Sequence, residues 1–217
     1  MDDAVQSFPT WSVVVPVKRL DVAKSRLGDD RQSRAELAMA FALDCVTALL
    51  AARSVARVIV ISADEALRPI MRARGADWLD ETDAHGLNGA AMQALATVDG
   101  PAAVVVGDLP SLTPAAVDLV AELARAVPRG FISDAEGTGT TMLLARDRAD
   151  CVPAFGARSR ARHRSAGFVD LGLDATLDRT RALDLARARR DVDTDVDLAD
   201  AIRLGVGDAT ARILQSG

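Results

Sequence analysis

The hydrophobic positions of this chain fall into short continuous runs that alternate with longer, helically spaced segments. Continuous runs rich in β-branched residues are typical of buried strands, and they occupy residues 11–17, 57–62 and 102–106. A shorter run at 76–79 predicts a further strand, and two more are expected at 130–133 and 141–145. These strands are the expected centre of the fold.

Between the first runs, apolar residues recur every three or four positions, which predicts helices over 31–52, 64–74 and 86–98. Gly75 is expected to end the second of these. Thr113 followed by Pro114 marks another helix start, because Thr is a preferred N-cap and Pro suits the first turn. Further helices are predicted over 158–166 and most of 173–189, with a last one ending at Leu204.

The repeated order of strand and helix predicts the fold class. Alternating strands and helices form βαβ units, so we expect an α/β fold with a mostly parallel central sheet between helical layers, a three-layer sandwich. The chain has 217 residues and neither a repeat nor a low-complexity linker. We therefore expect one domain spanning 1–217, with the last third folding back over the sheet edge.

Composition and charge narrow the function classes. Aromatic residues make up 3% of the chain, which argues against a base-stacking surface, and the net charge of −5 disfavours nucleic acid as a partner. The two cysteines, Cys45 and Cys151, show no paired spacing and fit a reducing compartment. Neither a signal-peptide pattern nor a run long enough for a membrane span is present. We expect a cytoplasmic protein without a membrane partner.

The loop after the first strand carries four candidate phosphate-binding residues. Cations and hydrogen-bond donors at a strand-to-helix turn suit a nucleoside triphosphate. A solvated basic loop is the alternative, and the loop lacks the glycine pattern of a P-loop. The four residues are Lys18, Lys24, Ser25 and Arg26.

Three aspartates are candidate metal ligands. Asp108 follows the strand at 102–106, where a carboxylate either binds Mg²⁺ beside substrate phosphates or belongs to a turn. Asp191 and Asp193 alternate on an extended segment, so both can face one cation. Thr194 is expected to cap the following helix, with Asp195 at its positive end. The alternative to metal binding is a cap and surface acid cluster.

For two further segments, the sequence allows both a ligand-binding role and a purely structural one. Residues 137–141 read GTGTT and form either an anion-binding nest or a tight hairpin. The basic segment 158–164 is either a second anion site or a solvated helix face. His85 and His163 stand apart from any Ser or Cys nucleophile pattern, and no zinc-ligand spacing occurs.

The order of these motifs is more specific than any one of them. The series VPVKxLxxAKSRL, HGLNxA, GDLPxL, GTGTT, FGxxSxxxH and DVDTxxDL runs through almost the whole chain. It resembles the 2-phospho-L-lactate and phosphoenolpyruvate guanylyltransferase family of coenzyme F-420 biosynthesis. The resemblance implies a Rossmann-like nucleotidyltransferase fold of the glycosyltransferase-A type, with Mg²⁺ as cofactor and GTP as donor.

The resemblance also implies roles for particular residues. The triphosphate would lie on Lys18, Lys24, Ser25 and Arg26, and the nucleoside would contact His85, Gly86 and Asn88. Asp108, Asp191 and Asp193 would hold the metal, with Lys24, Arg26 and Asp108 acting in catalysis. The phosphorylated three-carbon acid would be bound by residues matching the family positions, namely Thr140, Gly156 and Ser159.

The acceptor and the partners are expectations of the same kind. High Ala and Arg content is typical of a high-GC bacterial genome, whose family members use phosphoenolpyruvate, so we expect that acceptor over 2-phospho-L-lactate. A non-catalytic nucleotide-binding domain and a cytidylyl- or molybdopterin guanylyltransferase are the competing readings. Two further partners are possible: the downstream deazaflavin transferase, which would draw off the product, and a second copy of this chain in a homodimer. The link through 171–190 is longer than the family pattern. The resemblance therefore does not predict how this segment covers the acceptor site or contributes to a dimer.

Overall fold

The computed structural model describes residues 10–20, 31–82, 86–173 and 176–216. Within them, one sheet is formed by β1 (Trp11–Pro16), β2 (Val55–Ser62), β3 (Asp77–Asp80), β4 (Ala102–Val105), β5 (Arg129–Ser133), β6 (Thr140–Ala145) and β7 (Val169–Asp170). The helices are α1 (Arg31–Ala51), α2 (Leu67–Ala73), α3 (Gly86–Leu95), α4 (Pro114–Ala124), α5 (Ser159–Ser165), α6 (Arg179–Arg189), α7 (Asp195–Leu204) and α8 (Asp208–Ser216).

The sheet has the strand order β3-β2-β1-β4-β6-β5-β7. Pairings are parallel from β3 through β4 and again between β5 and β7, whereas β6 runs antiparallel to both of its neighbours. The predicted mostly parallel sheet is confirmed. Because β6 is reversed, it begins at the same edge where β1, β4 and β5 end, and this brings polar residues from four strands together.

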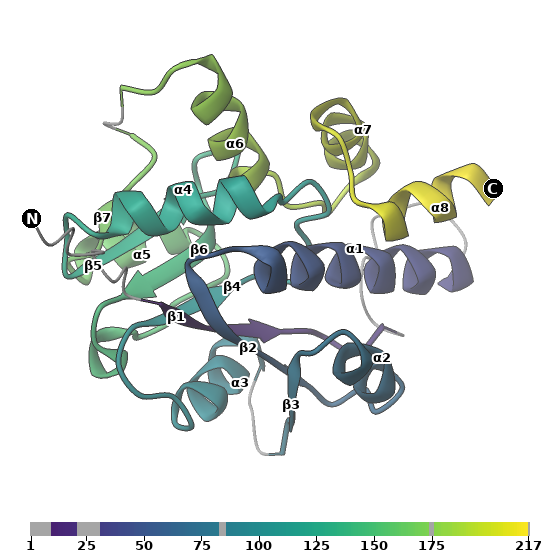
Figure 1. Ribbon diagram of the computed structural model, residues 1–217, viewed down its shortest axis with the longest axis horizontal. Helices are drawn as coiled ribbons and strands as arrows, with labels where there is room; N and C mark the ends of the chain where they lie inside the picture. Colours follow the sequence, from purple (N-terminus) through teal and green to yellow (C-terminus); the bar gives the residue numbers. More distant parts are fainter. Residues whose placement is uncertain (1–9, 21–30, 83–85, 174–175, 217) are drawn as a thin grey trace, which may run out of the picture.

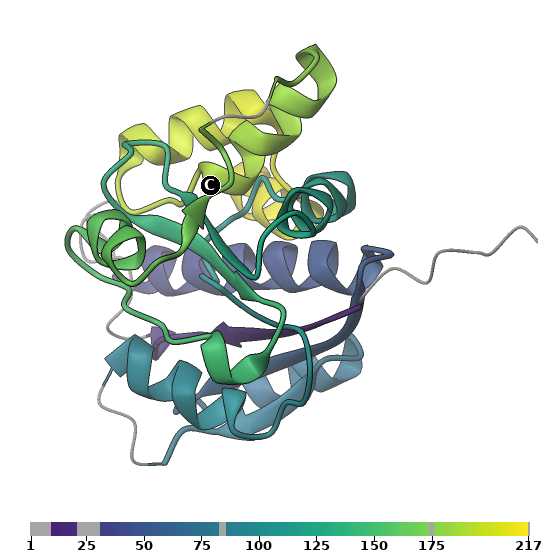
Figure 2. The same cartoon turned by 90° about the vertical axis from the view of Figure 1, so that its left-hand side faces the viewer.

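Helices cover both faces of the sheet, as a three-layer α/β sandwich requires (Figure 1). Helices α1 and α4 lie on one face and α3 on the other, and the view turned by 90° shows the same layers (Figure 2). Two main cores fill the space between the layers, one beneath α1 and α4 and one beneath α3. Both are built chiefly of Ala, Val, Leu and Ile, as the scarcity of aromatic residues predicts.

Capping residues and hydrophobic periodicity in the sequence predicted the bounds of most helices and strands correctly. Thr113 is the N-cap of α4, with its hydroxyl accepting the Ala116 N–H and Pro114 in the first turn. The expected helix over 173–189 is shorter at its start, because Asp178 caps α6 through the N–H groups of Thr180 and Arg181. Helix α7 ends at Leu204 as expected, but the expectation that it is the last helix is wrong, since α8 follows.

The segment 171–190, expected from the sequence to be longer than the family pattern, supplies α6. This helix packs against α4 at a steep angle, and Arg181 of α6 pairs with Glu122 of α4 at 2.8 Å (Figure 1). Leu185 and Ala188 of α6 are buried in the core beneath α4. The described part of this segment therefore includes a helix that packs against α4. No helix among the described residues is long and apolar enough to cross a bilayer.

Helix α8 is held by a carboxylate from far along the chain. Asp44 of α1 is buried, and its two oxygens accept the N–H groups of Ala209 and Thr210, each at 2.9 Å. The first N–H groups of a helix have no partner within the helix, so this side chain acts as a cap supplied by another helix. A local sequence pattern cannot reveal such a cap.

Asp44→Ala is expected to lower the free energy of unfolding by about 2 kcal/mol, because two N–H groups lose a charged acceptor. Thermal unfolding followed by circular dichroism measures the effect, and Asp99→Ala, which removes an exposed carboxylate, is the matched control. Equal melting temperatures for the two variants would contradict the capping role.

Candidate active site

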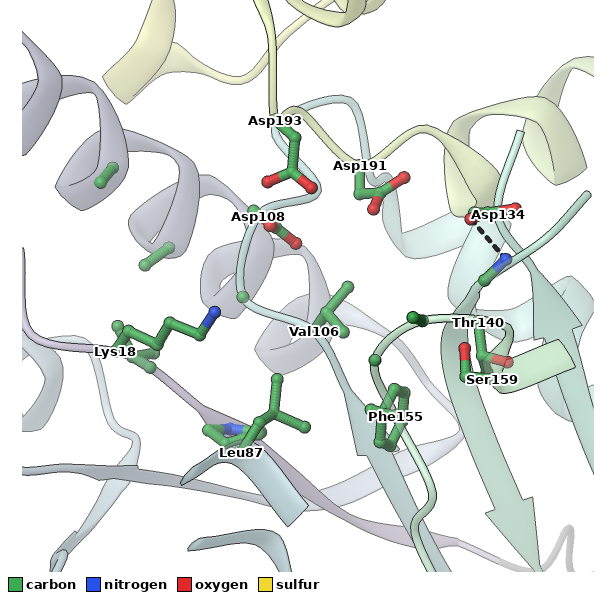
Figure 3. Close-up of a pocket in the computed structure, with 18 of the residues that line it drawn as sticks. Lys18, Leu87, Val106, Asp108, Asp134, Thr140, Phe155, Ser159, Asp191 and Asp193 are labelled. Carbon is green, nitrogen blue, oxygen red and sulfur yellow. Dashed lines mark hydrogen bonds between the residues drawn. The ribbon is translucent and has the colours of Figure 1, made fainter. Parts of the chain in front are cut away.

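A cavity of about 720 Å³ opens at the sheet edge where β1, β4 and β5 end and β6 begins. Its lining combines carboxylates on one side with hydroxyl groups and a glycine-containing loop on the other (Figure 3). The carboxyl ends of parallel strands are where open α/β sheets bind their ligands. The cavity therefore occupies the position that the fold favours for a functional site.

Three predicted metal ligands line one side of this cavity. Asp108 follows β4, whereas Asp191 and Asp193 come from the extended segment before α7. The Val192 N–H donates to the Asp108 carbonyl oxygen at 3.1 Å, which fixes that segment beside the end of β4. All three residues thus line the same side of the cavity although two sequence-distant segments supply them (Figure 3).

The helix cap of α7 is made by other residues. The Thr194 hydroxyl accepts the Asp197 N–H, and the Asp197 carboxylate accepts the Thr194 N–H in return, which forms a capping box. The prediction that Thr194 is the cap is confirmed. Because Asp197 completes the cap, the side chains of Asp191 and Asp193 remain at the cavity.

The environment of Asp191 disfavours its charged form. Burial, followed by the negative charges of Asp108, Asp193 and Asp134, raises the pKa of Asp191 to about 8. Such a set of oxygen donors is unfavourable when fully ionised and is suited to a hard divalent cation. As they stand, no three Asp, Glu, His or Cys side chains in the described ranges are arranged to hold a metal ion together.

Asp134, at the end of β5, is a cavity residue that the sequence analysis missed. Its carboxylate accepts the N–H groups of Thr138 and Gly139 at 2.8 and 2.6 Å, within the turn between β5 and β6. A Cβ at position 139 would collide with this carboxylate, which explains the glycine. The segment 137–141 is therefore a hairpin whose exposed N–H groups are satisfied by its own aspartate.

Asp134→Asn is expected to lower the free energy of unfolding by about 2 kcal/mol, since a carboxamide has one acceptor oxygen for two N–H donors. It also removes one of the charges that raise the pKa of Asp191. Urea unfolding compares this variant with Glu136→Gln, which changes an exposed acid of the same turn. A loss of similar size in both variants would refute the turn-holding role of Asp134.

The opposite side of the cavity is formed by Thr140, Gly156 and Ser159, the three residues predicted to bind the acid. Thr140 opens β6, Gly156 lies in the loop before α5, and Ser159 begins α5. Figure 3 shows the Thr140 and Ser159 hydroxyls side by side. The structure thus brings the three together, from segments separated along the chain, and their predicted role in binding remains a prediction.

The floor of the cavity is apolar and is supplied by Leu87 and Phe155 (Figure 3). Neighbouring Asn88 fixes this floor, because its carboxamide donates to the Phe155 carbonyl oxygen at 3.0 Å and accepts the Phe155 N–H at 2.7 Å. Among residues 86–88, it is Leu87 that lines the cavity. The predicted nucleoside contact of Gly86 and Asn88 stays a prediction, and His85 lies outside the described residues.

Lys18 lies directly after β1, and its side chain points into the cavity opposite Thr140 and Ser159 (Figure 3). Its position is fixed by the parallel pairing of β1 and by the Val17 N–H bond to the Ile61 carbonyl oxygen at 2.9 Å. The other members of the predicted phosphate loop, Lys24, Ser25 and Arg26, fall outside the described residues.

The basic segment 158–164 is tied to the surrounding structure. Arg160 pairs with Asp170 at 2.9 Å, and Arg162 donates to the carbonyl oxygens of Ala154 and Phe155. Arg158 lines the cavity. Arg162 therefore braces the loop before α5, and Arg160 ties α5 to β7, so that the solvated-face interpretation covers only part of the segment.

The mostly parallel seven-stranded sheet with one reversed strand, carrying acids and a lysine at its carboxyl edge, resembles solved nucleotidyltransferase folds. The chain superposes on a nucleotidyl transferase from Methanothermobacter thermautotrophicus with a TM-score of 0.55 at 18% identity, over 96% of this chain and 99% of that one. A Mycobacterium tuberculosis protein solved in complex with manganese gives a TM-score of 0.53 at 18% identity, over 90% and 98%. The predicted fold class is confirmed.

Comparison of sequences identifies the family, which the structural likeness does not. The model of the family described as guanylyl transferase CofC like matches residues 11–216. The phosphoenolpyruvate guanylyltransferase of Streptomyces coelicolor is 43% identical over 210 residues, covering 94% of this chain and 95% of the relative. The chain therefore belongs to the CofC-like guanylyl transferase family, and the resemblance inferred from its motifs is confirmed.

Proposed function

We propose that this protein transfers GMP from GTP to phosphoenolpyruvate, giving enolpyruvyl-diphospho-5'-guanosine and pyrophosphate in coenzyme F-420 biosynthesis. Beyond family membership, the main structural support for the proposal is the arrangement of the cavity. The cavity places carboxylates and Lys18 opposite a pair of hydroxyl groups, so that two anionic ligands can lie end to end between them. The choice of phosphoenolpyruvate over 2-phospho-L-lactate rests on the name of the Streptomyces relative.

The donor nucleotide is assigned to the β1 side of the cavity. Lys18 supplies a cation to the triphosphate, with Lys24, Ser25 and Arg26 of the following segment completing the phosphate site. The guanosine lies toward Leu87 and Phe155, whose apolar surfaces form the floor. His85, Gly86 and Asn88 are proposed to contact it. Lys24, Arg26 and Asp108 are the residues proposed to act at the reacting phosphate.

A divalent cation, proposed to be Mg²⁺, fits the donor set of this site. The ligands would be Asp108, Asp191 and Asp193, whose crowded oxygens are relieved of mutual repulsion by a positive ion. When bound, such an ion neutralises phosphate charge and lets two anions approach each other. The manganese complex of the Mycobacterium tuberculosis protein supports the use of a divalent metal.

The acceptor acid is assigned to Thr140, Gly156 and Ser159. Their hydroxyls and the loop backbone orient its phosphate toward the α-phosphorus of GTP. An oxygen of that phosphate attacks the α-phosphorus, the bond to the β-phosphate oxygen breaks, and pyrophosphate leaves with the electron pair. Since no enzyme nucleophile is required, the residues contribute by positioning the two ligands and by stabilising charge.

A pyrophosphate-release assay tests this function. Each nucleoside triphosphate is combined with phosphoenolpyruvate or 2-phospho-L-lactate in the presence of Mg²⁺, with and without the downstream deazaflavin transferase. Turnover that requires both GTP and phosphoenolpyruvate supports the proposal. A requirement for CTP, or for 2-phospho-L-lactate, would replace it with the corresponding alternative. Absence of turnover with every pair would favour a non-catalytic nucleotide-binding domain.

A further inference from the structure

His163 lies behind the acceptor side of the cavity and contacts it through two hydrogen bonds. It sits on α5 with no exposed surface, and its ring is surrounded by Phe131, Phe155 and Phe168 at centroid distances of 5.8, 5.4 and 5.7 Å. Nδ1 lies 2.9 Å from the Thr140 hydroxyl oxygen, and Nε2 lies 3.0 Å from the Ala154 nitrogen.

The partner of Nε2 determines which ring nitrogen carries the proton. A backbone N–H can only donate, so Nε2 must present its lone pair to Ala154. The proton of the neutral ring then resides on Nδ1, which donates to the Thr140 oxygen. Burial, followed by the charge of Arg162, lowers the pKa of His163 to about 4, so the ring is neutral at physiological pH.

This tautomer has a consequence for Thr140. A hydroxyl group has one proton to donate and two lone pairs to accept with. Because the Thr140 oxygen accepts from Nδ1–H, its own proton is directed elsewhere, and the residue lines the cavity beside Ser159. Thr140 therefore presents a donor to the cavity, as an anionic ligand requires.

We propose that His163 is a positioning residue that makes Thr140 a hydrogen-bond donor to the phosphorylated acid. This inference rests on the proposed function, in which Thr140 contacts that acid. The same ring also fixes the loop before α5 through Ala154, so one imidazole joins the two walls of the acceptor site. His163 itself touches neither substrate nor the reacting atoms.

Two substitutions separate the two hydrogen bonds. In His163→Gln the carbonyl oxygen can take the place of Nε2 and accept from Ala154, whereas Thr140 loses its donor. In His163→Asn the amide nitrogen can take the place of Nδ1 and donate to Thr140, whereas Ala154 loses its acceptor. We expect the Gln variant to raise the KM for phosphoenolpyruvate about tenfold, with the KM for GTP and kcat within about twofold. The Asn variant should melt at a lower temperature and keep an acceptor KM within about threefold of the wild type.

A second comparison ties the effect to Thr140. In a Thr140→Val background, His163→Gln should produce no further increase in the acceptor KM, because its target hydroxyl is gone. Thr141→Val is the matched control, because the Thr141 hydroxyl donates to the Ala188 carbonyl oxygen, at 2.8 Å, and not to His163. In that background, His163→Gln should still raise the acceptor KM. An increase that persists in the Thr140→Val background, or equal increases in the Gln and Asn variants, would overturn the inference.

The tautomer can be read without any substrate. The chain contains two histidines, so ¹⁵N NMR of the ring nitrogens, assigned with a His85→Gln variant, identifies the protonated nitrogen of His163. A protonated Nδ1 is expected, and a protonated Nε2 would overturn the inference. Wild-type protein without phosphoenolpyruvate turnover would instead refute the proposed function, and the ring resonances would still decide the hydrogen-bond arrangement.

Discussion

Asp191→Asn is expected to abolish turnover and, at the same time, to stabilise the metal-free protein at alkaline pH. The loss of activity should be about 10³-fold, since a ligand of the proposed cation is removed and several kcal/mol of charge stabilisation depend on that ion. The gain in stability follows from the burial of Asp191, followed by the negative charges of Asp108, Asp193 and Asp134 around it. Residues that serve a reaction at a cost in folding free energy show this pair of effects.

The pH dependence of this gain has a definite direction. The pKa of Asp191 is about 8 in the folded protein, against 3.8 for an unperturbed aspartate. Between these values the folded chain holds a proton that the unfolded chain releases, so the free energy of unfolding falls as pH rises toward 8. Asparagine does not titrate. The variant should therefore exceed the wild type by a margin that grows from pH 5 to pH 9.

Thermal unfolding in EDTA across this pH range measures the margin, which we expect to reach about 5 °C at pH 9. Mg²⁺ or Mn²⁺ should raise the melting temperature of the wild type and leave that of Asp191→Asn unchanged. Asp195→Asn is the matched control, because it removes an exposed carboxylate from the first turn of α7. An Asp191→Asn variant that is less stable than the wild type at pH 9 would contradict the described crowding.

Lys18→Ala is expected to lower kcat/KM for GTP about 10²-fold, the second largest effect. The side chain projects from the end of β1 into the cavity and is proposed to hold the triphosphate (Figure 3). A preorganised positive group at a phosphate contributes more to the transition state than the same charge in water. Lys18→Arg keeps the charge in a planar fork, so it should restore part of the activity.

Steady-state kinetics with varied GTP compares these variants with Arg53→Ala. Arg53 is an exposed cation paired with Asp118 at 3.1 Å, and its removal changes the net charge by the same amount. We expect Arg53→Ala to match the wild type. A Lys18→Ala variant with unchanged kcat/KM for GTP would show that the triphosphate does not lie on the β1 side.

The sequence predicted the sheet and the place of Asp108 because both follow from local rules, whereas the grouping of Asp108 with Asp191 and Asp193 came from the family resemblance. Short β-branched runs define buried strands, and a polar residue directly after a parallel strand lies at the binding edge. Asp108 obeys this rule. Asp134 follows β5 in the same way and could have been found by this rule. The sequence left an anion nest and a hairpin open for the adjacent GTGTT segment, because it does not show that Asp134 satisfies the N–H groups there.

Other features depend on contacts between distant segments, which periodicity does not contain. The cap of α8 comes from Asp44, and the floor loop is tied to α3 by Asn88. His163 stands apart from any Ser or Cys nucleophile pattern, and its partners, the Ala154 N–H and the Thr140 hydroxyl on β6, are distant contacts that the sequence does not show. The two-residue β7 is too short for any pattern, and its pairing with β5 depends on tertiary packing.

The central claim is that GMP is joined to the phosphate of the acid, and ³¹P NMR tests it most directly. GTP, phosphoenolpyruvate, Mg²⁺ and the protein are mixed, and spectra are recorded at early times, with the downstream transferase and its deazaflavin acceptor as a trap in a parallel sample. We predict pyrophosphate together with a new pair of coupled phosphorus signals from an unsymmetrical diphosphate, both absent with Asp191→Asn. Pyrophosphate accompanied only by GMP, or unchanged GTP in both samples, would contradict the account.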